Sequence, residues 1–175
     1  VRDPRNVVTS IANHYQISTR NAFDFMKDKN RGIIEKDGNR FTGFQPLFSW
    51  DLHLKSWTEN TLYPSIIIKY EDLLIDTAST FKKVLEFTKK VTSSKDSIDD
   101  GKLLKCVENC KFSNLKMMEK ETGFDESMVN KKTGNRITFF NLGEKNNFKD
   151  ILEKDLIDEM NDYFKYQLKK YKYII

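Results

Sequence analysis

A short apolar run constrains the fold of this chain more than any other feature of its sequence. After Pro64, residues 65–70 are Ser-Ile-Ile-Ile-Lys-Tyr, and their apolar side chains do not alternate with polar ones. Such a run is typical of a strand that is buried on both faces of a parallel sheet. Because helices cover both faces of such sheets, the sequence predicts a three-layer α/β fold around a central parallel sheet.

Helical spacing of apolar residues accounts for most of the remaining chain. It predicts helices over residues 4–25, 47–62, 102–110 and 113–121, a helix that Asp76 caps, and a closing helix from Asp155. Residues 27–43 are polar and rich in turn residues such as Gly38 and Asn39, which predicts a loop. Residues 137–140 are predicted to be a short extended piece. We therefore expect this chain to be mainly helical.

The predicted sheet is too small to be stable by itself. Val1 resembles the end of a second strand, since Pro4 favours the first turn of a helix that follows at once. One strand and this stub cannot form a stable parallel sheet. We therefore expect residues 1–175 to be the C-terminal part of a single, N-terminally truncated domain. Such a piece is expected to aggregate and to be inactive when it is expressed alone.

Size and charge exclude several classes of protein. The chain has 175 residues, enough for one domain, and a net charge of +4 from 30 basic and 26 acidic residues. So mild an excess does not indicate nucleic-acid binding, although it is compatible with an anionic small ligand. No apolar run of about 18 residues and no signal peptide occurs, so we expect a cytoplasmic protein without a membrane span.

The cysteines do not indicate a disulfide framework or a metal site. Cys106 and Cys110 lie four residues apart on a predicted helix. A zinc site needs two further ligands, which His14 and His53 are poorly placed in the sequence to supply. We therefore expect two reduced thiols and no metal.

The first ten residues have the chemistry of an anion site. The sequence predicts a strand end, a tight turn and then a helix whose free backbone N–H groups and dipole attract phosphate. Arg2 stands at the carboxyl end of the strand, where open α/β sheets bind ligands, and Ser10 adds a hydroxyl two turns into the helix. In the alternative interpretation, Arg2 pairs with Asp3 or another carboxylate, and Ser10 faces solvent.

This segment also carries a resemblance to a known family. Arg2-Asp3-Pro4-Arg5-Asn6-Val7, with Ser10 eight residues after Arg2, resembles the second signature of sulfotransferases that use 3′-phosphoadenylyl sulfate (PAPS). The resemblance implies a P-loop-like α/β fold, of which this chain supplies mainly the helical C-terminal part. It also implies that Arg2 and Ser10 hold the 3′-phosphate of the nucleotide.

Further motifs match the same family in order along the chain. Residues 49–57 resemble its Ser-Trp-x-x-His-x-x-x-Trp helix, and residues 68–74 resemble its strand ending in Tyr-Glu-Asp-Leu. The resemblance implies that Phe112 packs against adenine, and that residues 139–149 form the late loop that closes over the 3′-phosphate. Tyr70 either reaches the nucleotide or is anchored by its acidic neighbours, and both interpretations stay open.

The late loop departs from the family pattern. The family has Arg-Lys-Gly where this chain has Asn141, Leu142 and Gly143, so one phosphate-binding arginine is missing. Asn141 can donate a hydrogen bond but carries no charge. We consider Arg136 and Lys145 as candidates to compensate for this loss.

No catalytic base is predicted within the chain. In the family, the phosphate-cradling loop and the usual base precede the segment that resembles residues 2–10, so the catalytic groups are expected upstream of residue 1. His14 and His53 lie on amphipathic helices, where histidines are more often packing residues. Trp50 and Trp57 have the spacing of core residues, with the wall of an acceptor pocket as the alternative.

The resemblance therefore implies a sulfotransferase that moves a sulfuryl group from PAPS to a hydroxyl or amine of a small molecule or a glycan. The alternative is a non-catalytic nucleotide-binding remnant, or an interaction module, with the same fold. A nucleoside or shikimate-type kinase fragment would share the layered fold but does not account for Phe112 or the loop at Gly143. The oligomeric state stays open.

Overall fold

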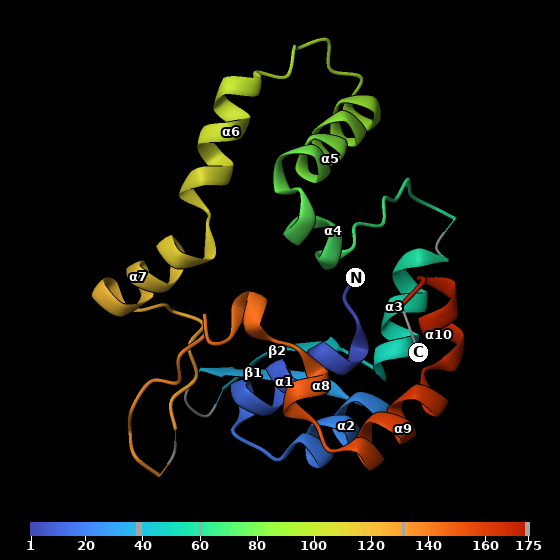
Figure 1. Cartoon of the computed structure of the whole chain (residues 1–175), viewed down its shortest axis with the longest axis vertical. Coiled ribbons are helices and arrows are strands. Elements are labelled where there is room, and N and C mark those ends of the chain that lie inside the picture. Colours follow the sequence, from blue (N-terminus) through green and yellow to red (C-terminus); the bar gives the residue numbers. More distant parts are fainter. Residues whose placement is uncertain (38–39, 60, 131, 174–175) are drawn as a thin grey trace. The chain divides into compact units, whose positions relative to one another are not determined.

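The computed structural model describes residues 1–37, 40–59, 61–130 and 132–173. The chain divides into two compact units, which we describe separately (Figure 1). The helical unit consists of Val1–Arg2 and Leu62–Asn146, and the core unit consists of Asp3–Thr61 and Asn147–Ile175. Of the helices in the described part of the chain, none has both the length and the apolar character that a membrane span requires.

The core unit begins with two helices where the sequence predicts one. α1 (Pro4–Tyr15) ends because Gln16 adopts the left-handed conformation, with φ of 52°. The Ser18 side chain then accepts a hydrogen bond from the N–H of Asn21 and begins α2 (Thr19–Lys27). The prediction of one continuous helix over residues 4–25 is therefore wrong. The left-handed residue ends the first helix, and the serine cap begins the second.

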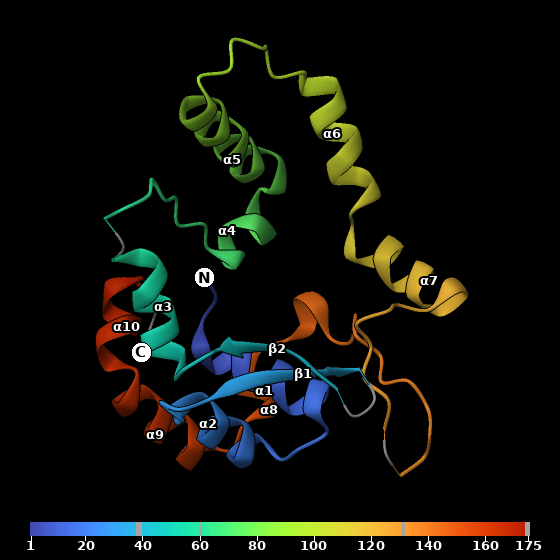
Figure 2. The ribbon, with the colours of Figure 1, turned by 180° about the vertical axis from the view of Figure 1, so that it is seen from behind.

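The polar segment that was predicted to be a loop contains a β-hairpin. β1 (Gly32–Asp37) pairs with β2 (Arg40–Pro46) in antiparallel register, with an irregularity at Glu35 and Lys36 (Figure 2). The turn residues Gly38 and Asn39 lie outside the described residues. A Cβ atom on Gly32 would lie 2.3 Å from the ring of Phe44, so a larger residue here would require that ring to move. The prediction of a loop over residues 27–43 is therefore wrong. The segment contains too few apolar residues for its sequence pattern to indicate strands.

Four further helices complete the core unit. They are α3 (Trp50–Thr58), α8 (Phe148–Ile151), α9 (Lys154–Tyr163) and α10 (Lys165–Lys170). The predicted helices at residues 47–62 and from Asp155 are thus present, the first shorter than predicted and the second divided at Phe164.

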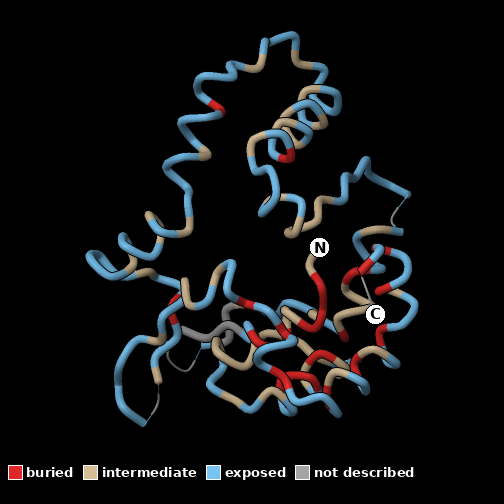
Figure 3. Tube along the Cα trace, in the orientation of Figure 1, coloured by how far each residue is buried: buried red, intermediate tan, exposed pale blue. Residues whose placement is uncertain are grey.

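A hydrophobic core joins these elements of the core unit (Figure 3). The Phe164 ring is fully buried, and its centroid lies 5.9 Å from that of Phe23 and 5.2 Å from that of Trp50. Burial of one such side chain stabilises the fold by about 1.5–3 kcal/mol. The other buried apolar residues of α1, α2, α9 and α10 include Val8, Ala22, Met26, Leu156, Met160 and Leu168.

The helical unit is made of helices joined by irregular segments. These helices are α4 (Tyr70–Ile75), α5 (Thr77–Thr92), α6 (Asp100–Asn109), α7 (Phe112–Thr122) and the short 3₁₀ helix η1 (Gly143–Lys145). The predicted cap of α5 is confirmed, since the Asp76 side chain accepts a hydrogen bond of 2.9 Å from the N–H of Ser79. The predicted helices at residues 102–110 and 113–121 are confirmed as α6 and α7.

The predicted strand at residues 65–70 is present only as a single paired position. The N–H group of Val1 donates to the carbonyl of Ile68, and the N–H group of Tyr70 donates to the carbonyl of Val1. This pattern is that of a parallel pair between Val1 and Lys69. Tyr70 itself begins α4, so its predicted place in the strand is wrong. Among the described residues the only sheet is the β1–β2 pair, and the predicted central parallel sheet is not confirmed.

The segment before η1 is extended over part of its length. Arg136 forms an isolated antiparallel bridge with Val129, and the N–H of Ile137 donates to the carbonyl of Met128. The chain then bends at Phe139 and Phe140, so the predicted extended piece ends two residues early.

Candidate functional site

Arg2 in the helical unit is positioned by an aromatic ring. Its guanidinium carbon lies 4.3 Å from the centroid of the Tyr70 ring, a distance typical of a cation–π contact. Its Nε atom is buried and has no hydrogen-bond partner among the described residues. A buried donor of this kind is costly unless a ligand supplies an acceptor. Arg2 and Tyr70, two predicted site residues, are therefore neighbours in the structure.

Asp3 pairs with Arg5 in the core unit. The Asp3 carboxylate accepts hydrogen bonds from Arg5 Nη2 at 2.6 Å and from Arg5 Nε at 2.9 Å. It also accepts the backbone N–H of Arg5 and so caps α1. The alternative interpretation, in which Arg2 pairs with Asp3 or another carboxylate, stays a prediction.

Arg5 connects the beginning of α1 to the end of the chain. Only 2% of this residue is exposed. Its Nη1 atom donates to the side chain of Asn161 at 2.8 Å, and its guanidinium carbon lies 4.1 Å from the centroid of the Phe148 ring. The N–H of Phe148 in turn donates to the side chain of Asn6. Sequence reasoning missed this role of Arg5, since its partners lie more than a hundred residues away.

Ser10 lies on α1 and is exposed. Its hydroxyl donates to the carbonyl of Asn6 at 3.4 Å, a long and weak hydrogen bond. His14, one turn further along α1, is half-buried and packs edge-on against Tyr15.

Phe112 and the loop of Asn141, Leu142 and Gly143 lie together in the helical unit. Gly143 has a φ of 57°, and a Cβ atom at this position would lie 2.6 Å from the Phe112 ring. Only glycine fits both the left-handed conformation and this contact. The Phe112 ring also meets Phe140 edge to face, with centroids 6.2 Å apart. The structure thus brings together the predicted adenine contact and the predicted phosphate loop.

Glu119 of α7 fixes the start of this loop. One carboxylate oxygen accepts the N–H of Phe139 at 2.6 Å and the hydroxyl of Ser127 at 3.0 Å, and the other accepts the N–H of Phe140 at 2.9 Å. Burial opposes the charge of this carboxylate. The three donors and the neighbouring charge of Lys116 outweigh burial, so the pKa of Glu119 lies below its ordinary value. Sequence reasoning missed Glu119 because no local pattern marks it.

The cations that surround the loop differ in their partners. Lys116 Nζ donates to the carbonyl of Asn141 at 2.9 Å. Arg136, a candidate to compensate for the missing arginine, donates through Nη1 to the carbonyl of Phe124 at 2.6 Å. Lys145, the other candidate, is exposed in η1. Lys116 and Arg136 also line a cavity of about 280 Å³ in the helical unit.

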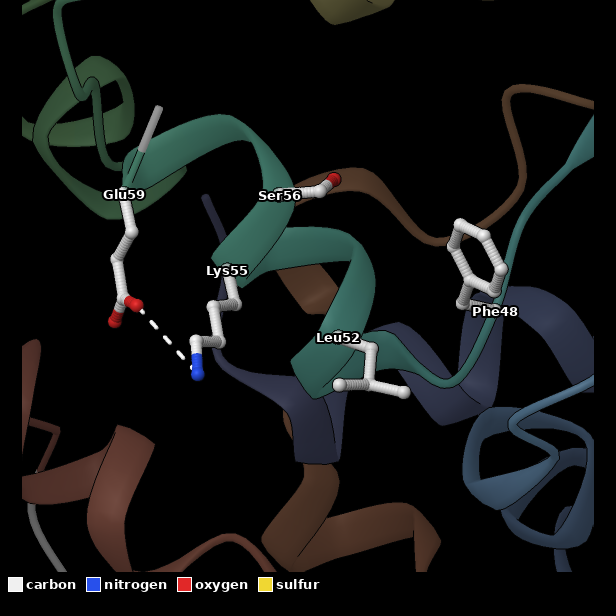
Figure 4. Close-up of a pocket in the computed structure, with 5 residues that line it drawn as sticks. All are labelled: Phe48, Leu52, Lys55, Ser56 and Glu59. Atoms are coloured by element: carbon white, nitrogen blue, oxygen red, sulfur yellow. Dashed lines mark ion pairs between the residues drawn. The ribbon is translucent and has the colours of Figure 1, made fainter. Parts of the chain in front are cut away.

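The core unit has an open cavity beside α3, with a volume of about 520 Å³ (Figure 4). It is lined by Phe48, Leu52, Lys55, Ser56 and Glu59, and Lys55 pairs with Glu59 at 3.7 Å across its edge. None of the predicted site residues lines it.

The two tryptophans of α3 have different surroundings. Trp50 packs against Phe164, which agrees with its interpretation as a core residue. Trp57 is 67% exposed, so its interpretation as a core residue is wrong, because α3 buries only one of its sides. The ring of His53 is half-buried, with its centroid 6.4 Å from that of Trp57.

The two cysteines are both free and exposed, as expected for reduced thiols. In the part of the chain that the structure describes, no group of three or more His, Cys, Asp or Glu residues could hold a metal ion.

Comparison with known proteins identifies the family. No curated protein matches the chain. The sulfotransferase domain family matches residues 1–172, a range that includes the whole helical unit and the core unit as far as residue 172. The match contains all residues of the signature at Arg2 and of the loop at Gly143. The resemblance drawn from the motifs is thereby confirmed, and the kinase alternative is excluded: the chain belongs to the sulfotransferase family.

Proposed function

We propose that this chain carries the nucleotide-binding part of an enzyme that transfers a sulfuryl group from PAPS to a hydroxyl or amine. The observation that carries the proposal is the family match over residues 1–172, which includes every predicted nucleotide contact. Those contacts are Arg2, Ser10, Tyr70, Phe112, Asn141, Leu142 and Gly143. We further propose that both units belong to one sulfotransferase domain, because the match extends across them.

The residues present fit a phosphorylated nucleotide. Arg2 offers a buried Nε donor that lacks an acceptor among the described residues, on a guanidinium whose face rests on Tyr70. A phosphate oxygen would satisfy this donor with a charge-assisted hydrogen bond. Phe112, the first residue of α7, offers an aromatic ring next to the Gly143 loop. An aromatic ring beside phosphate-binding groups suits a nucleotide, whose base stacks while its phosphates are bound.

PAPS supplies an activated sulfuryl group. The acceptor oxygen or nitrogen forms a bond to sulfur while the bond from sulfur to the phosphate oxygen breaks, and the acceptor proton passes to a base. The bisphosphate nucleotide leaves. In this scheme Arg2 and Ser10 bind the 3′-phosphate, and Phe112 orients the adenine. None of the residues described above is proposed as the base.

The second candidate function is nucleotide binding without catalysis. It is favoured by Asn141 and Leu142, which replace the charged pair that the family has in its late loop. The acceptor class, a small molecule or a glycan, and the cytoplasmic location stay predictions from the sequence. An assay of sulfuryl transfer from PAPS by the full-length protein separates the two candidates, because turnover is expected only of the enzyme.

Calorimetric titration with adenosine 3′,5′-bisphosphate tests the nucleotide site. We expect Arg2→Ala to weaken binding by about 2 kcal/mol or more and Ser10→Ala by about 1 kcal/mol, since a charged donor contributes more than a neutral one. Arg20→Ala is the matched control, because Arg20 is an exposed arginine that pairs with Glu159. Equal affinity of Arg2→Ala and the parent protein would remove Arg2 from the site.

A further inference from the structure

The late loop lacks the arginine that binds phosphate in the family, so another cation is needed to supply that charge. Asn141 and Leu142 stand where the family has Arg-Lys, so the loop itself supplies no cation at these two positions. We propose that Lys116 of α7 supplies the phosphate-binding charge at this loop in place of that arginine. This inference rests on the proposed nucleotide-binding function.

Lys116 is tied directly to the loop position that lost its charge. Its Nζ atom donates to the carbonyl of Asn141 at 2.9 Å, so the ammonium group lies against the backbone of that residue. Lys116 follows Phe112 by one helical turn, and its Nζ lies 5.8 Å from the centroid of the Phe112 ring. The same helix therefore presents the aromatic ring and, on the same side, a cation.

The ammonium group of Lys116 keeps donors for a ligand. Of its three N–H bonds, the Asn141 carbonyl uses one. No ion pair among the residues that the structure describes involves Lys116. The neighbouring carboxylate of Glu119 accepts three hydrogen bonds from Phe139, Phe140 and Ser127. The ammonium group of Lys116 thus keeps N–H donors for an anion, although its charge also acts on the nearby Glu119 carboxylate.

The loop is fixed to the same helix as this cation. Glu119 holds the N–H groups of Phe139 and Phe140, the two residues before Asn141, and Gly143 packs on the Phe112 ring. Lys116, Glu119 and Phe112 are thus all residues of α7 that contact residues 139–143. A cation whose position is set before the ligand arrives binds it with a smaller loss of conformational entropy.

The side chains of the two other candidate cations have no hydrogen bond to Asn141 among the described residues. The Arg136 guanidinium donates to the carbonyl of Phe124, which lies before the loop. Lys145 lies in η1 and is exposed, and its side chain forms no ion pair among the described residues. Of the three side chains, Lys116 is the one that contacts residue 141.

The test compares two ligands that differ by one phosphate. Adenosine 3′,5′-bisphosphate and adenosine 5′-phosphate are titrated calorimetrically into the full-length protein, and the ratio of their affinities measures the contribution of the 3′-phosphate. We expect Lys116→Gln to weaken bisphosphate binding by about 10- to 100-fold, the value of a charge-assisted hydrogen bond, and to leave the monophosphate affinity unchanged within about twofold. Lys116→Arg keeps the charge and should retain most of the ratio.

Three neutralising variants serve as matched controls. Lys120→Gln removes the same charge from the same helix one turn later, and Arg136→Gln and Lys145→Gln remove the competing candidates. Each should change the affinity ratio by less than about twofold, the size of an ordinary surface substitution. Because Lys116 is exposed, the circular dichroism and melting temperature of Lys116→Gln should match those of the parent.

The outcomes separate this inference from the proposed function. If the parent protein does not prefer the bisphosphate, the proposed nucleotide site itself is wrong. If the parent prefers the bisphosphate and Lys116→Gln keeps that preference, Lys116 is not the replacement cation. A loss of preference in Arg136→Gln or Lys145→Gln alone would assign the role to that residue and overturn the inference. If Lys116→Gln misfolds, the folded Lys116→Arg variant is compared with the parent. Loss of the preference for the bisphosphate in this variant contradicts the inference that Lys116 supplies the charge, and a retained preference supports that inference.

Discussion

The core unit and the helical unit keep their elements in place by different interactions. In the core unit, helices from both ends of the sequence bury large apolar side chains such as Phe23, Met160 and Phe164. In the helical unit, Leu103 is the one buried apolar residue among those that the structure describes, whereas Ile75, Phe81 and Met117 are exposed. The loop at residues 139–143 is held mainly by hydrogen bonds to Glu119 and by the contact of Gly143 with Phe112.

This difference predicts which substitutions lower global stability and which change only the local order of the loop. Apolar burial is non-directional and contributes to global stability, so core positions tolerate loss of volume poorly. A hydrogen-bonded carboxylate instead fixes a few backbone groups in one geometry, and its effect depends on pH. We therefore expect substitutions in the core unit to lower global stability, and substitutions around Glu119 to change local order at the loop.

The largest effect is expected for Phe164→Ala in the core unit. Phe164 is fully buried between Phe23 and Trp50, so the truncation creates a cavity and should lower the free energy of unfolding by about 3–5 kcal/mol. Phe81→Ala is the matched control in the helical unit, where the side chain is 39% exposed, and should cost less than about 1 kcal/mol. Urea unfolding measures both, and equal losses would contradict the comparison.

The next effect is that of Arg5→Met, which leaves the buried carboxylate of Asp3 without its cation. We expect a loss of about 3 kcal/mol, the lower end for a broken buried pair, because Asp3 keeps the N–H of residue 5 as a donor. The double variant Asp3→Asn/Arg5→Met removes both charges and should recover most of the loss. A double variant as unstable as Arg5→Met in urea unfolding would show that the guanidinium packing on Phe148, and not the ion pair, dominates.

A smaller and local effect is expected for Glu119→Gln. The amide has one oxygen where the carboxylate has two, so at least one of the N–H groups of Phe139 and Phe140 loses its acceptor. This loss costs about 1–3 kcal/mol of local stability, which should accelerate hydrogen exchange of these amides about tenfold or more. Glu121→Gln, at an exposed position of the same helix, is the control and should leave exchange at Phe139 and Phe140 unchanged.

The same carboxylate predicts a pH dependence with a definite sign. Because the fold lowers the pKa of Glu119, its contribution is complete above the unfolded pKa of about 4.3 and is lost as the pH falls through the folded pKa. Protection of the Phe139 and Phe140 amides, after correction for intrinsic exchange, should therefore decrease below about pH 4 in the parent protein. In Glu119→Gln the corrected protection should not change with pH, and an unchanged acid dependence would assign the titration to another group.

The smallest effect is expected for Asp76→Ala at the beginning of α5. The Asp76 side chain accepts the N–H of Ser79, so its removal should cost about 1 kcal/mol. Asp125→Ala, at an exposed position of the same unit, should stay within about 0.5 kcal/mol. Urea unfolding that detects no difference between the two variants would mean that the helical unit does not depend on this cap.

Local patterns in the sequence were sufficient to predict most of the helices of the helical unit. The apolar spacing over α5, α6 and α7 and the aspartate before α5 indicate these helices without reference to any distant residue. The β1–β2 hairpin, the break at Gln16 and the helical conformation of Tyr70 were not predicted. In these segments the polar residues and the short apolar runs are compatible with more than one structure, and tertiary contacts select one of them.

The sequence by itself determined the family, through ordered motifs from Arg2 to Gly143, and with it the chemistry to expect. Only the tertiary structure decided which side chains fix those motifs. Arg5 meets Asn161, and Glu119 meets Phe139 and Phe140, across separations that carry no local periodicity. The physical reason is that a motif specifies residue types along the chain, whereas a buried ion pair or a hydrogen-bonded loop depends on distances that exist only after the chain has folded.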